Sequence, residues 1–257
     1  MQTLYLIVFF IFGLLMGSFL TVVGSRIPKK ENFVNSRSYC DKCHHQLSFL
    51  DLIPIVSYLC LGGRCRYCKA KIDDLSSFME LFTGILFALS YYVFGFSLDL
   101  LIALGIISML IIISVTDINY LIIPDEVLIF FAGYFIIIYA LQGGVVLALI
   151  NIAYGLLLFF IMYMIMIIGN FIFKKETMGG GDVKMMFVFG LLVHPLLGLF
   201  VIFIASLLAL PVSLIMYYSK KQRLVPFGPF LLISLAFIYF TGINVDMILD
   251  FVNSFSI

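Results

Sequence analysis

The stretch VVLALINIAYGLLLFFIMYMIMIIGNFIF, residues 145–173, decides the fold of this chain. It carries no charged side chain and exceeds the ~20 apolar residues with which an α-helix crosses the hydrocarbon core of a bilayer. Lipid offers no hydrogen-bonding partners, so a crossing segment must pair its own backbone amides. The stretch therefore predicts a membrane-spanning helix.

The composition extends this interpretation to the whole chain of 257 residues. Hydrophobic residues make up 63% of it, and charged residues 11%, against about 25% in an average soluble domain. The mean hydropathy is +1.19. This composition excludes a soluble protein and a disordered chain, and a net charge of +1 gives no basic field for nucleic acid. We expect an all-α polytopic membrane protein whose non-protein partner is the lipid bilayer.

Eight apolar runs are candidate transmembrane helices, although the sixth is short and either continues through His194-Pro195 or tilts. The runs are Leu4 to Val23, Phe78 to Phe96, Leu98 to Val115, Val127 to Leu141, Val145 to Phe173, Val183 to Val193, Leu196 to Tyr218 and Phe227 to Phe240. The breaks between them hold turn signals or charges, among them Gln142-Gly143-Gly144, Lys174-Lys175-Glu176 and Lys220-Lys221-Gln222-Arg223.

The basic residues predict the topology, because cytoplasmic segments near the spans are rich in Lys and Arg. The 15 basic residues fall into three groups, between Arg26 and Lys71, around the glycine run at 179–181, and at 220–223. With eight crossings all three groups lie on one side, which puts both termini outside. No basic residue precedes the first run, so we expect a retained anchor and not a cleaved signal peptide.

We expect three parts: a first transmembrane helix at 1–25, a cytoplasmic insert at 26–77 and a seven-helix membrane core at 78–257. The insert holds all five cysteines. Two CxxC pairs, separated by 21 residues, are typical of a structural zinc site with four thiolate ligands. The predicted ligands are Cys40, Cys43, Cys65 and Cys68.

Two disulfides are the alternative for this quartet, but the cytoplasm keeps thiols reduced. Gly62 and Gly63 are expected to form a turn before the second pair. The fifth cysteine, Cys60, is interpreted as a small buried apolar residue. His44 and His45 are alternative ligands, although we interpret both as solvated loop residues.

Two acids at the ends of apolar runs are candidate catalysts. Asp117 closes the third span and Asp182 opens the sixth, and the predicted topology puts both at the cytoplasmic edge. Two neighbouring carboxylates of low solvation share one proton. The ionised member can then deprotonate water while the protonated member polarises a peptide carbonyl, which is the chemistry of aspartic proteases.

Helix capping is the competing interpretation of these acids. Asp182 follows three glycines and suits an N-cap, and for Asp125 and Glu126, after Pro124, we favour capping. Gly179-Gly180-Gly181 predicts an unwound stretch, since glycine permits close backbone approach and positive φ. A substrate strand could lie alongside such a stretch.

Six motifs in order make the chain resemble the type IV prepilin peptidases, polytopic leader peptidases of the GxGD type, many of which are also N-methyltransferases. The matching motifs are Gly17-Ser18-Phe19 with Arg26-Ile27-Pro28, the paired CxxC enclosing Asp51-Leu52-Ile53-Pro54, Glu80 with Thr83-Gly84, Asp117 with Ile123-Pro124-Asp125, Gly179-Gly180-Gly181-Asp182-Val183-Lys184, and Pro226-Phe227-Gly228-Pro229-Phe230.

This resemblance implies that Asp117 and Asp182 are the catalytic pair and that the enzyme lies in the bacterial plasma membrane. It implies substrates that are prepilins or pseudopilins, with a short basic leader before a hydrophobic helix. Acids near the site (Glu80, Asp125 and Glu126) are candidates for docking that leader. We expect the glycines 179–181 and Lys184 to support the same site.

Methylation of the new N-terminus with S-adenosylmethionine is a second activity that the resemblance implies for many members. The chain has no Gly-rich nucleotide-binding fingerprint of the Rossmann kind, but its paired cysteines are intact. Two other functions compete: a small-solute transporter or channel with a regulatory zinc insert, and a catalytically inactive scaffold for pilus assembly. The presence of both aspartates argues against the scaffold.

Overall fold

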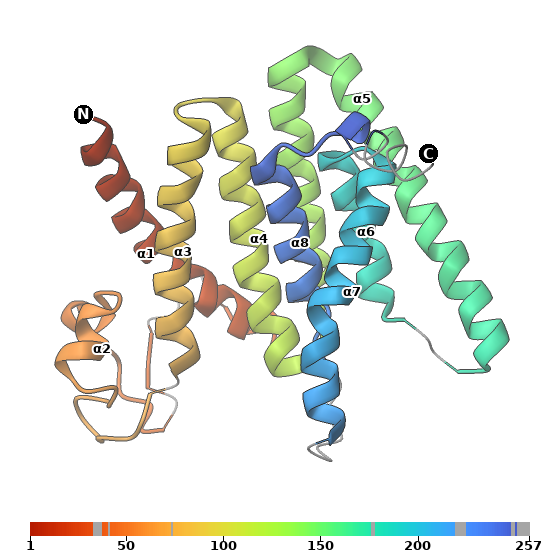
Figure 1. The fold of residues 1–257 in the computed structure, drawn as a ribbon. Coiled ribbons are helices and arrows are strands. Elements are labelled where there is room, and N and C mark those ends of the chain that lie inside the picture. Colours follow the sequence, from red (N-terminus) through yellow and green to blue (C-terminus); the bar gives the residue numbers. More distant parts are fainter. Residues whose placement is uncertain are drawn as a thin grey trace. The chain divides into compact units, whose positions relative to one another are not determined.

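The structure is a computed structural model that describes residues 1–32, 38–40, 42–72, 74–175, 178–218, 225–247 and 250, without the side chains of Phe49 and Tyr217. Asp41, Glu176 and the charged break at 220–223 lie outside the described residues. The described elements are helical (Figure 1): α1 (Gln2–Arg26), η1 (Phe49–Leu52), α2 (Val56–Cys60), α3 (Asp74–Phe94), α4 (Leu98–Tyr120), α5 (Asp125–Phe173), α6 (Gly180–Leu192), α7 (Pro195–Tyr218) and α8 (Gly228–Thr241).

Among the residues described, five helices are long and apolar enough to cross a membrane, namely α1, α3, α4, α5 and α7. The protein is therefore a multi-pass membrane protein. The number of eight spans stays a prediction. The chain forms two compact units, Met1–Leu100 and Leu101–Ile257.

In unit 1, α1 and α3 pack closely because small residues face each other. A Cβ atom at Gly13 would come within 2.8 Å of the Cα of Gly84, and one at Gly17 within 2.9 Å of the Cα of Glu80. Without a hydrophobic driving force in lipid, close backbone approach of this kind is what holds spanning helices together. The Gly17-Ser18 motif of the sequence thus serves the α1–α3 contact.

In unit 2, α4 supplies much of the core. Its side chains Ile102, Ile106 and Ile111 are fully buried. The part of α5 that precedes Gly143 packs on it, because Gly105 leaves room for the rings of Tyr134 and Phe135. A spanning helix buried on several sides inside its own unit can carry a polar residue near its end without exposing that residue to lipid.

The long helix α5 bends where the sequence predicts a break. Gly143 and Gly144 leave the helical conformation, and Gly144 has a φ of +76°, which favours glycine. The two arms diverge from this bend (Figure 1). At 1.5 Å per residue α5 is about 74 Å long, more than twice the ~30 Å hydrocarbon core, which fits two crossings.

The short helix α6 differs from one expectation. It ends at Leu192, Val193 is extended, and α7 begins at Pro195. The sixth run therefore does not continue through His194-Pro195, because proline lacks the amide hydrogen that would extend the helix. The second arm of α5 supports α6 through a close contact, since a Cβ atom at Gly190 would lie 2.6 Å from the Cα of Gly155.

Candidate active site

Asp117 lies one turn before the end of α4 and is 6% exposed. The N–H of Leu121, whose φ is +55°, donates to the Asp117 carbonyl and ends the helix. The side chain accepts a hydrogen bond at Oδ2 from the backbone N–H of Gly228, at 2.9 Å. One carboxylate oxygen is therefore fixed by a donor from the start of α8.

Gly228, to which the sequence analysis gave no role, contacts Asp117 directly. A Cβ atom there would lie 3.0 Å from Asp117 Oδ2 and 3.0 Å from Ile113 Cγ2, so a side chain would push the carboxylate away. The motif Pro226-Phe227-Gly228-Pro229-Phe230 was the available signal. The geometry shows why the motif holds a glycine at this position: its amide donates to the acid, and a side chain there would collide with the carboxylate.

Asp182 lies in the first turn of α6, and the sequence interpretation of it as an N-cap is wrong. The N-cap is Gly179, whose carbonyl accepts from the N–H of Asp182 at 3.1 Å. The expectation of an unwound glycine run is also wrong, because Gly180 and Gly181 are helical and Gly179 alone is extended. The positive end of the α6 dipole favours a carboxylate at this place.

The beginning of α6 lies against the link between α4 and α5. A Cβ atom at Gly181 would lie 2.9 Å from the Cβ of Ile123, so the glycine permits a close approach here. The carboxyl groups of Asp182 and Asp117 interact electrostatically. The structure thus brings together two acids from distant parts of the sequence within unit 2.

An ion pair joins the same two segments. Lys184 Nζ donates to both carboxylate oxygens of Asp125, at 2.8 and 2.7 Å. The N-cap of α5 is Pro124, and Asp125 follows it, so the interpretation of Asp125 as a cap is wrong as well. The pair thus joins the beginning of α5 to the first turns of α6, which also carry Asp182.

Glu80 lies in unit 1, where its partners are local. Its Oε2 accepts from the backbone N–H of Ile55 at 3.0 Å, and the Ser18 hydroxyl also donates to the carboxylate. Glu80 thereby connects α1, α3 and the insert. Glu126, the third acid considered for the leader, is exposed in the first turn of α5.

The four predicted cysteine ligands form one cluster. Their Sγ atoms all lie within 4.8 Å of one another, and Cys40 Sγ is 3.8 Å from Cys68 Sγ. A tetrahedral ion with zinc–sulfur distances of about 2.3 Å separates its sulfurs by about 3.8 Å, so the donor set fits zinc. All five cysteines are free, which excludes the disulfide alternative.

Both CxxC pairs sit on similar turns. The amides of Cys40 and Cys65 donate to the carbonyls of His45 and Ala70, at 3.0 and 2.9 Å. His44 and Lys69 occupy equivalent places, with φ near +54° and +57°. The backbone N–H groups of Cys43 and then Lys42 lower the pKa of Cys40 to about 7, which favours the thiolate that a metal requires.

Two other expectations for the insert have clear outcomes. Gly62 and Gly63 both have positive φ, as a turn requires. Cys60 is exposed at the end of α2, so its interpretation as a buried residue is wrong. The helix α2 has only five residues, and none of them is buried. Cys60 at its end is therefore not covered by its own helix.

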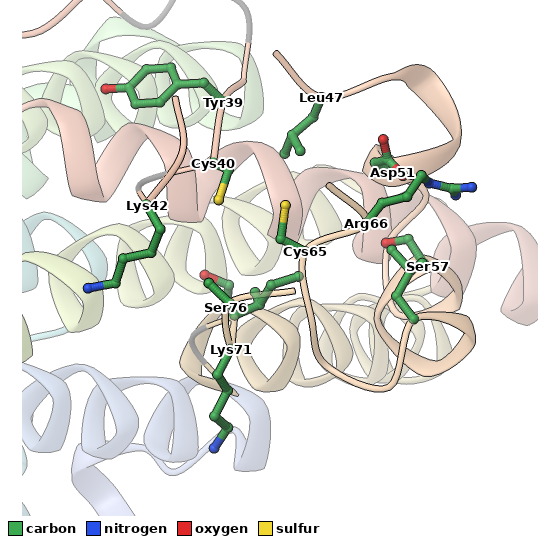
Figure 2. Close-up of a pocket in the computed structure, with 13 residues that line it drawn as sticks. Tyr39, Cys40, Lys42, Leu47, Asp51, Ser57, Cys65, Arg66, Lys71 and Ser76 are labelled. Atoms are coloured by element: carbon green, nitrogen blue, oxygen red, sulfur yellow. Dashed lines mark hydrogen bonds and ion pairs between the residues drawn. The ribbon is translucent and has the colours of Figure 1, made fainter. Parts of the chain in front are cut away.

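A pocket of about 280 Å³ adjoins the cysteine cluster (Figure 2). Cys40 and Cys65 line it together with the basic residues Lys42, Arg66 and Lys71. Apolar side chains of Leu47, Leu61 and Ile72 complete part of the wall. The pocket therefore combines an apolar wall with a charged lining in which Arg66 and Lys71 are already paired with Asp51 and Asp74.

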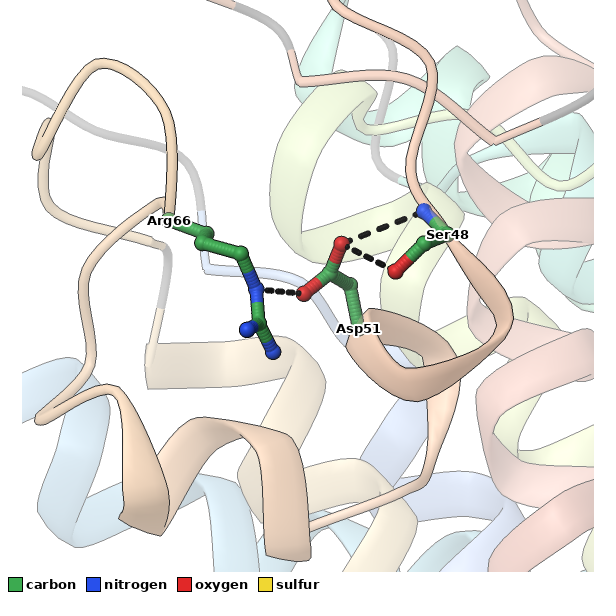
Figure 3. Close-up of polar contacts among 3 residues, drawn as sticks. All are labelled: Ser48, Asp51 and Arg66. Atoms are coloured by element: carbon green, nitrogen blue, oxygen red, sulfur yellow. Dashed lines mark hydrogen bonds and ion pairs between the residues drawn. The ribbon is translucent and has the colours of Figure 1, made fainter.

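Asp51 ties the two halves of the insert together (Figure 3). Arg66 Nε donates to its Oδ1 at 2.7 Å, and the Ser48 hydroxyl and amide donate to its Oδ2 at 2.7 and 3.1 Å. These hydrogen bonds, first that of the Ser48 hydroxyl and then those involving Arg66, hold the pKa of Asp51 below its ordinary value. Asp51 is thus a structural anion, since its side chain is 3% exposed and fully engaged.

Comparison with known proteins gives two family matches that follow one another along the chain. Residues 11–94 match the bacterial peptidase A24 N-terminal domain, and residues 104–214 match the type IV leader peptidase family. No solved structure matches.

Curated relatives match over most of their length. A prepilin leader peptidase/N-methyltransferase of Bacillus subtilis is 34% identical over 229 residues, covering 86% of this chain and 88% of the relative. The protein of that name from Vibrio cholerae is 30% identical over 256 residues, covering 94% and 98%. The one from Pseudomonas aeruginosa is 29% identical, covering 86% and 85%.

Proposed function

This chain belongs to the type IV leader peptidase family, and from that premise we propose that it is a membrane-embedded aspartic endopeptidase that removes the basic leader of prepilins or pseudopilins. The proposal is carried by the electrostatic interaction between Asp117 and Asp182, which come from neighbouring segments of unit 2, and by the Gly228 amide that donates to Asp117. The alternative of a transporter has no comparable support, because it offers no reason for a backbone donor on Asp117.

In the proposed mechanism the two carboxyl groups hold one proton between them, and the proton belongs to the pair. The ionised carboxylate takes a proton from water, and the hydroxide oxygen bonds to the scissile carbonyl carbon. The protonated carboxyl donates to the carbonyl oxygen. Collapse of the tetrahedral intermediate breaks the carbon–nitrogen bond, as the carboxyl that took the proton from water gives it to the leaving nitrogen and the former carbonyl oxygen returns its proton to the other carboxylate. The Gly228 amide keeps Asp117 oriented through these steps.

We propose that the cleavage site lies at the cytoplasmic edge of the bacterial plasma membrane, with both termini outside. The proposal rests on the placement of basic residues, since all three basic groups lie on one side if the chain crosses eight times. We retain the functional division into a first helix at 1–25, an insert at 26–77 and a membrane core at 78–257. A tag fused at the C-terminus tests this topology by its accessibility from outside the cell. A tag that can be reached only after the membrane is opened would contradict it.

For the insert we propose a structural zinc ion on Cys40, Cys43, Cys65 and Cys68. Four sulfur ligands leave no position for water or substrate, so the ion builds the insert and takes no part in cleavage. Immediate and reversible inhibition by EDTA, with the fold intact, would instead indicate a catalytic metal.

We further propose that the insert serves N-methylation with S-adenosylmethionine, which would supply the methyl group. The pocket beside the cysteines fits part of such a donor, because Lys42 brings a positive charge to its lining and the apolar wall suits its adenine. A volume near the lower end of ligand pockets fits one end of the molecule and not the whole. Equilibrium binding of S-adenosylmethionine to the intact protein, compared with Lys42→Ala, tests this assignment directly.

One experiment tests both activities. A pilin is co-expressed with the protein, and mass spectrometry determines the mature N-terminus. Cleavage just before the hydrophobic segment is expected with the unaltered chain, together with a methyl group if the second activity is present. An uncut pilin, with folded and membrane-inserted protein, would contradict the proposed peptidase.

A further inference from the structure

The insert exposes a group of apolar side chains on η1 and α2. The exposed fractions are 61% for Leu50, 53% for Val56 and 71% for Leu59, and Cys60 beside them is exposed too. We refer to residues 49–60 as the apolar segment. Neighbouring exposed apolar side chains of this kind mark a contact with a partner or a membrane.

The depth of this segment is fixed by its bond to a spanning helix. The Ile55 amide donates to Glu80 of α3, at 3.0 Å. Glu80 lies about 9 Å along α3 from Asp74, at 1.5 Å per residue. Phe78 and Leu81, on either side of it in sequence, are exposed apolar residues of a helix long enough to span. At the level of Glu80, α3 therefore already faces lipid, and α2 begins at that level.

The backbone conformation of Ile55 shows that its surroundings hold the apolar segment in place beside α3. Ile55 has φ +60° and ψ −46°, a conformation that a β-branched residue rarely adopts. Such strain persists only where the surroundings determine it. Here Glu80 holds the Ile55 amide, and buried Pro54 restricts the preceding turn. The chain thus turns sharply where it is bonded to α3, and α2 (Val56–Cys60) begins directly after this turn.

We propose that the apolar segment rests in the interfacial layer of the bilayer, with Leu50, Val56 and Leu59 at the boundary between head groups and acyl chains. Interfacial segments of this type bury their apolar face about 5–10 Å into that boundary. The attachment to a lipid-facing level of α3 favours lipid over a protein partner as the occupant. The basic residues elsewhere in the insert suit a surface of anionic head groups.

The chain contains no tryptophan, so a single introduced tryptophan reports its own surroundings. The protein carrying Leu59→Trp is placed in vesicles whose lipids bear bromine on the upper part of the acyl chain. We expect the brominated lipid to quench its emission about as strongly as that of Phe78→Trp, and the tryptophan to be protected from acrylamide in water. Phe78→Trp is the reference for lipid contact. Tyr67→Trp, at an exposed aromatic residue between two cysteines, is the reference for water.

Leu59→Trp emission that acrylamide quenches as strongly as that of Tyr67→Trp would overturn the proposal. Equal quenching of Leu59→Trp and Tyr67→Trp by the brominated lipid would also overturn the proposal, because the lipid contact would not be specific to the apolar segment. Protection that appears only at high protein-to-lipid ratio, or only when a pilin peptide is added, would assign the surface to a second copy or to substrate instead. Leu50→Trp repeats the measurement if the first variant does not retain its metal.

Discussion

The cysteine cluster of unit 1 and the aspartate pair of unit 2 are built in opposite ways. The four cysteines come from two local turns of the same kind, each closed by its own backbone hydrogen bonds. The aspartates come from two helices, and a third helix supplies the amide that orients one of them. The comparison teaches that a metal site can depend on local turns, whereas the dyad depends on how closely whole helices approach one another.

Substitution of either aspartate tests the second half of this comparison with the largest expected effect. Asp117→Asn or Asp182→Asn removes one member of the pair, and general acid–base catalysis of this kind contributes roughly 10²–10⁴-fold in rate. We expect cleavage of a prepilin peptide, followed by mass spectrometry, to fall by at least that range. Zinc content should be unchanged in both variants, since the insert is in the other unit. Appreciable residual cleavage by either variant would contradict the assignment of Asp117 and Asp182 as the catalytic pair.

Substitution of a cysteine tests the first half. Cys65 is 3% exposed, and Cys65→Ser should release the metal because three sulfurs no longer complete the tetrahedral set. Since metal binding of this type supplies about 10–16 kcal/mol of folding free energy, the insert should unfold. Elemental analysis and protease sensitivity of the insert measure this. Cys60→Ser is the matched control, because Cys60 lies outside the cluster and should leave the zinc content unchanged.

If the two sites are independent, Cys65→Ser should abolish methylation and spare cleavage by the membrane core. Loss of both activities in a protein whose spans remain folded would contradict the separation of the sites. Loss of neither, with the metal gone, would contradict the role proposed for the insert.

A smaller effect is expected from the backbone donor. In Gly228→Ala the new methyl group would meet Asp117 Oδ2 and Ile113 at 3.0 Å, so the carboxylate must shift. A misplacement of about 1 Å can cost ~10²-fold in rate. We expect kcat to fall with little change in KM. Gly133→Ala is the control, since a Cβ atom at that helical position meets nothing within 4 Å. Equal rates for both variants would show that the Gly228 contact does not position the acid.

The sequence predicted the features that depend on local chemistry. The break of α5 at Gly143-Gly144 and the cysteine cluster are both confirmed, because glycine pairs and CxxC spacing act over a few residues. The capping roles of Asp182 and Asp125 were wrong by one to three residues. An acid near a helix start suits several positions of the first turn, and only the backbone conformation distinguishes the cap from its neighbours.

Features that depend on tertiary contact were beyond the sequence. The motif around Gly228 draws attention to this residue, but it does not say that the Gly228 amide meets a carboxylate from α4, because the contact joins residues that are far apart along the chain. Cys60 was misassigned for a related reason. Its apolar character predicts burial, but whether a short helix of the insert is covered depends on what lies beside it.

The ion pair between Lys184 and Asp125 gives the smallest expected effect and the finest test of how unit 2 holds its dyad. Both side chains are more than half exposed, and exposed pairs contribute about 0–1 kcal/mol. Lys184→Met should therefore lower kcat only a few-fold. If the pair merely joins the beginnings of α5 and α6, the double variant Asp125→Lys, Lys184→Asp should restore kcat.

A leader that docks on Asp125 gives a different pattern. The exchanged pair would raise KM for a basic leader and not for a leader whose basic residues are neutralised. Measurement of kcat and KM with both peptides separates the two roles, because joining helices concerns only the paired charges, whereas docking requires the acid to face the substrate.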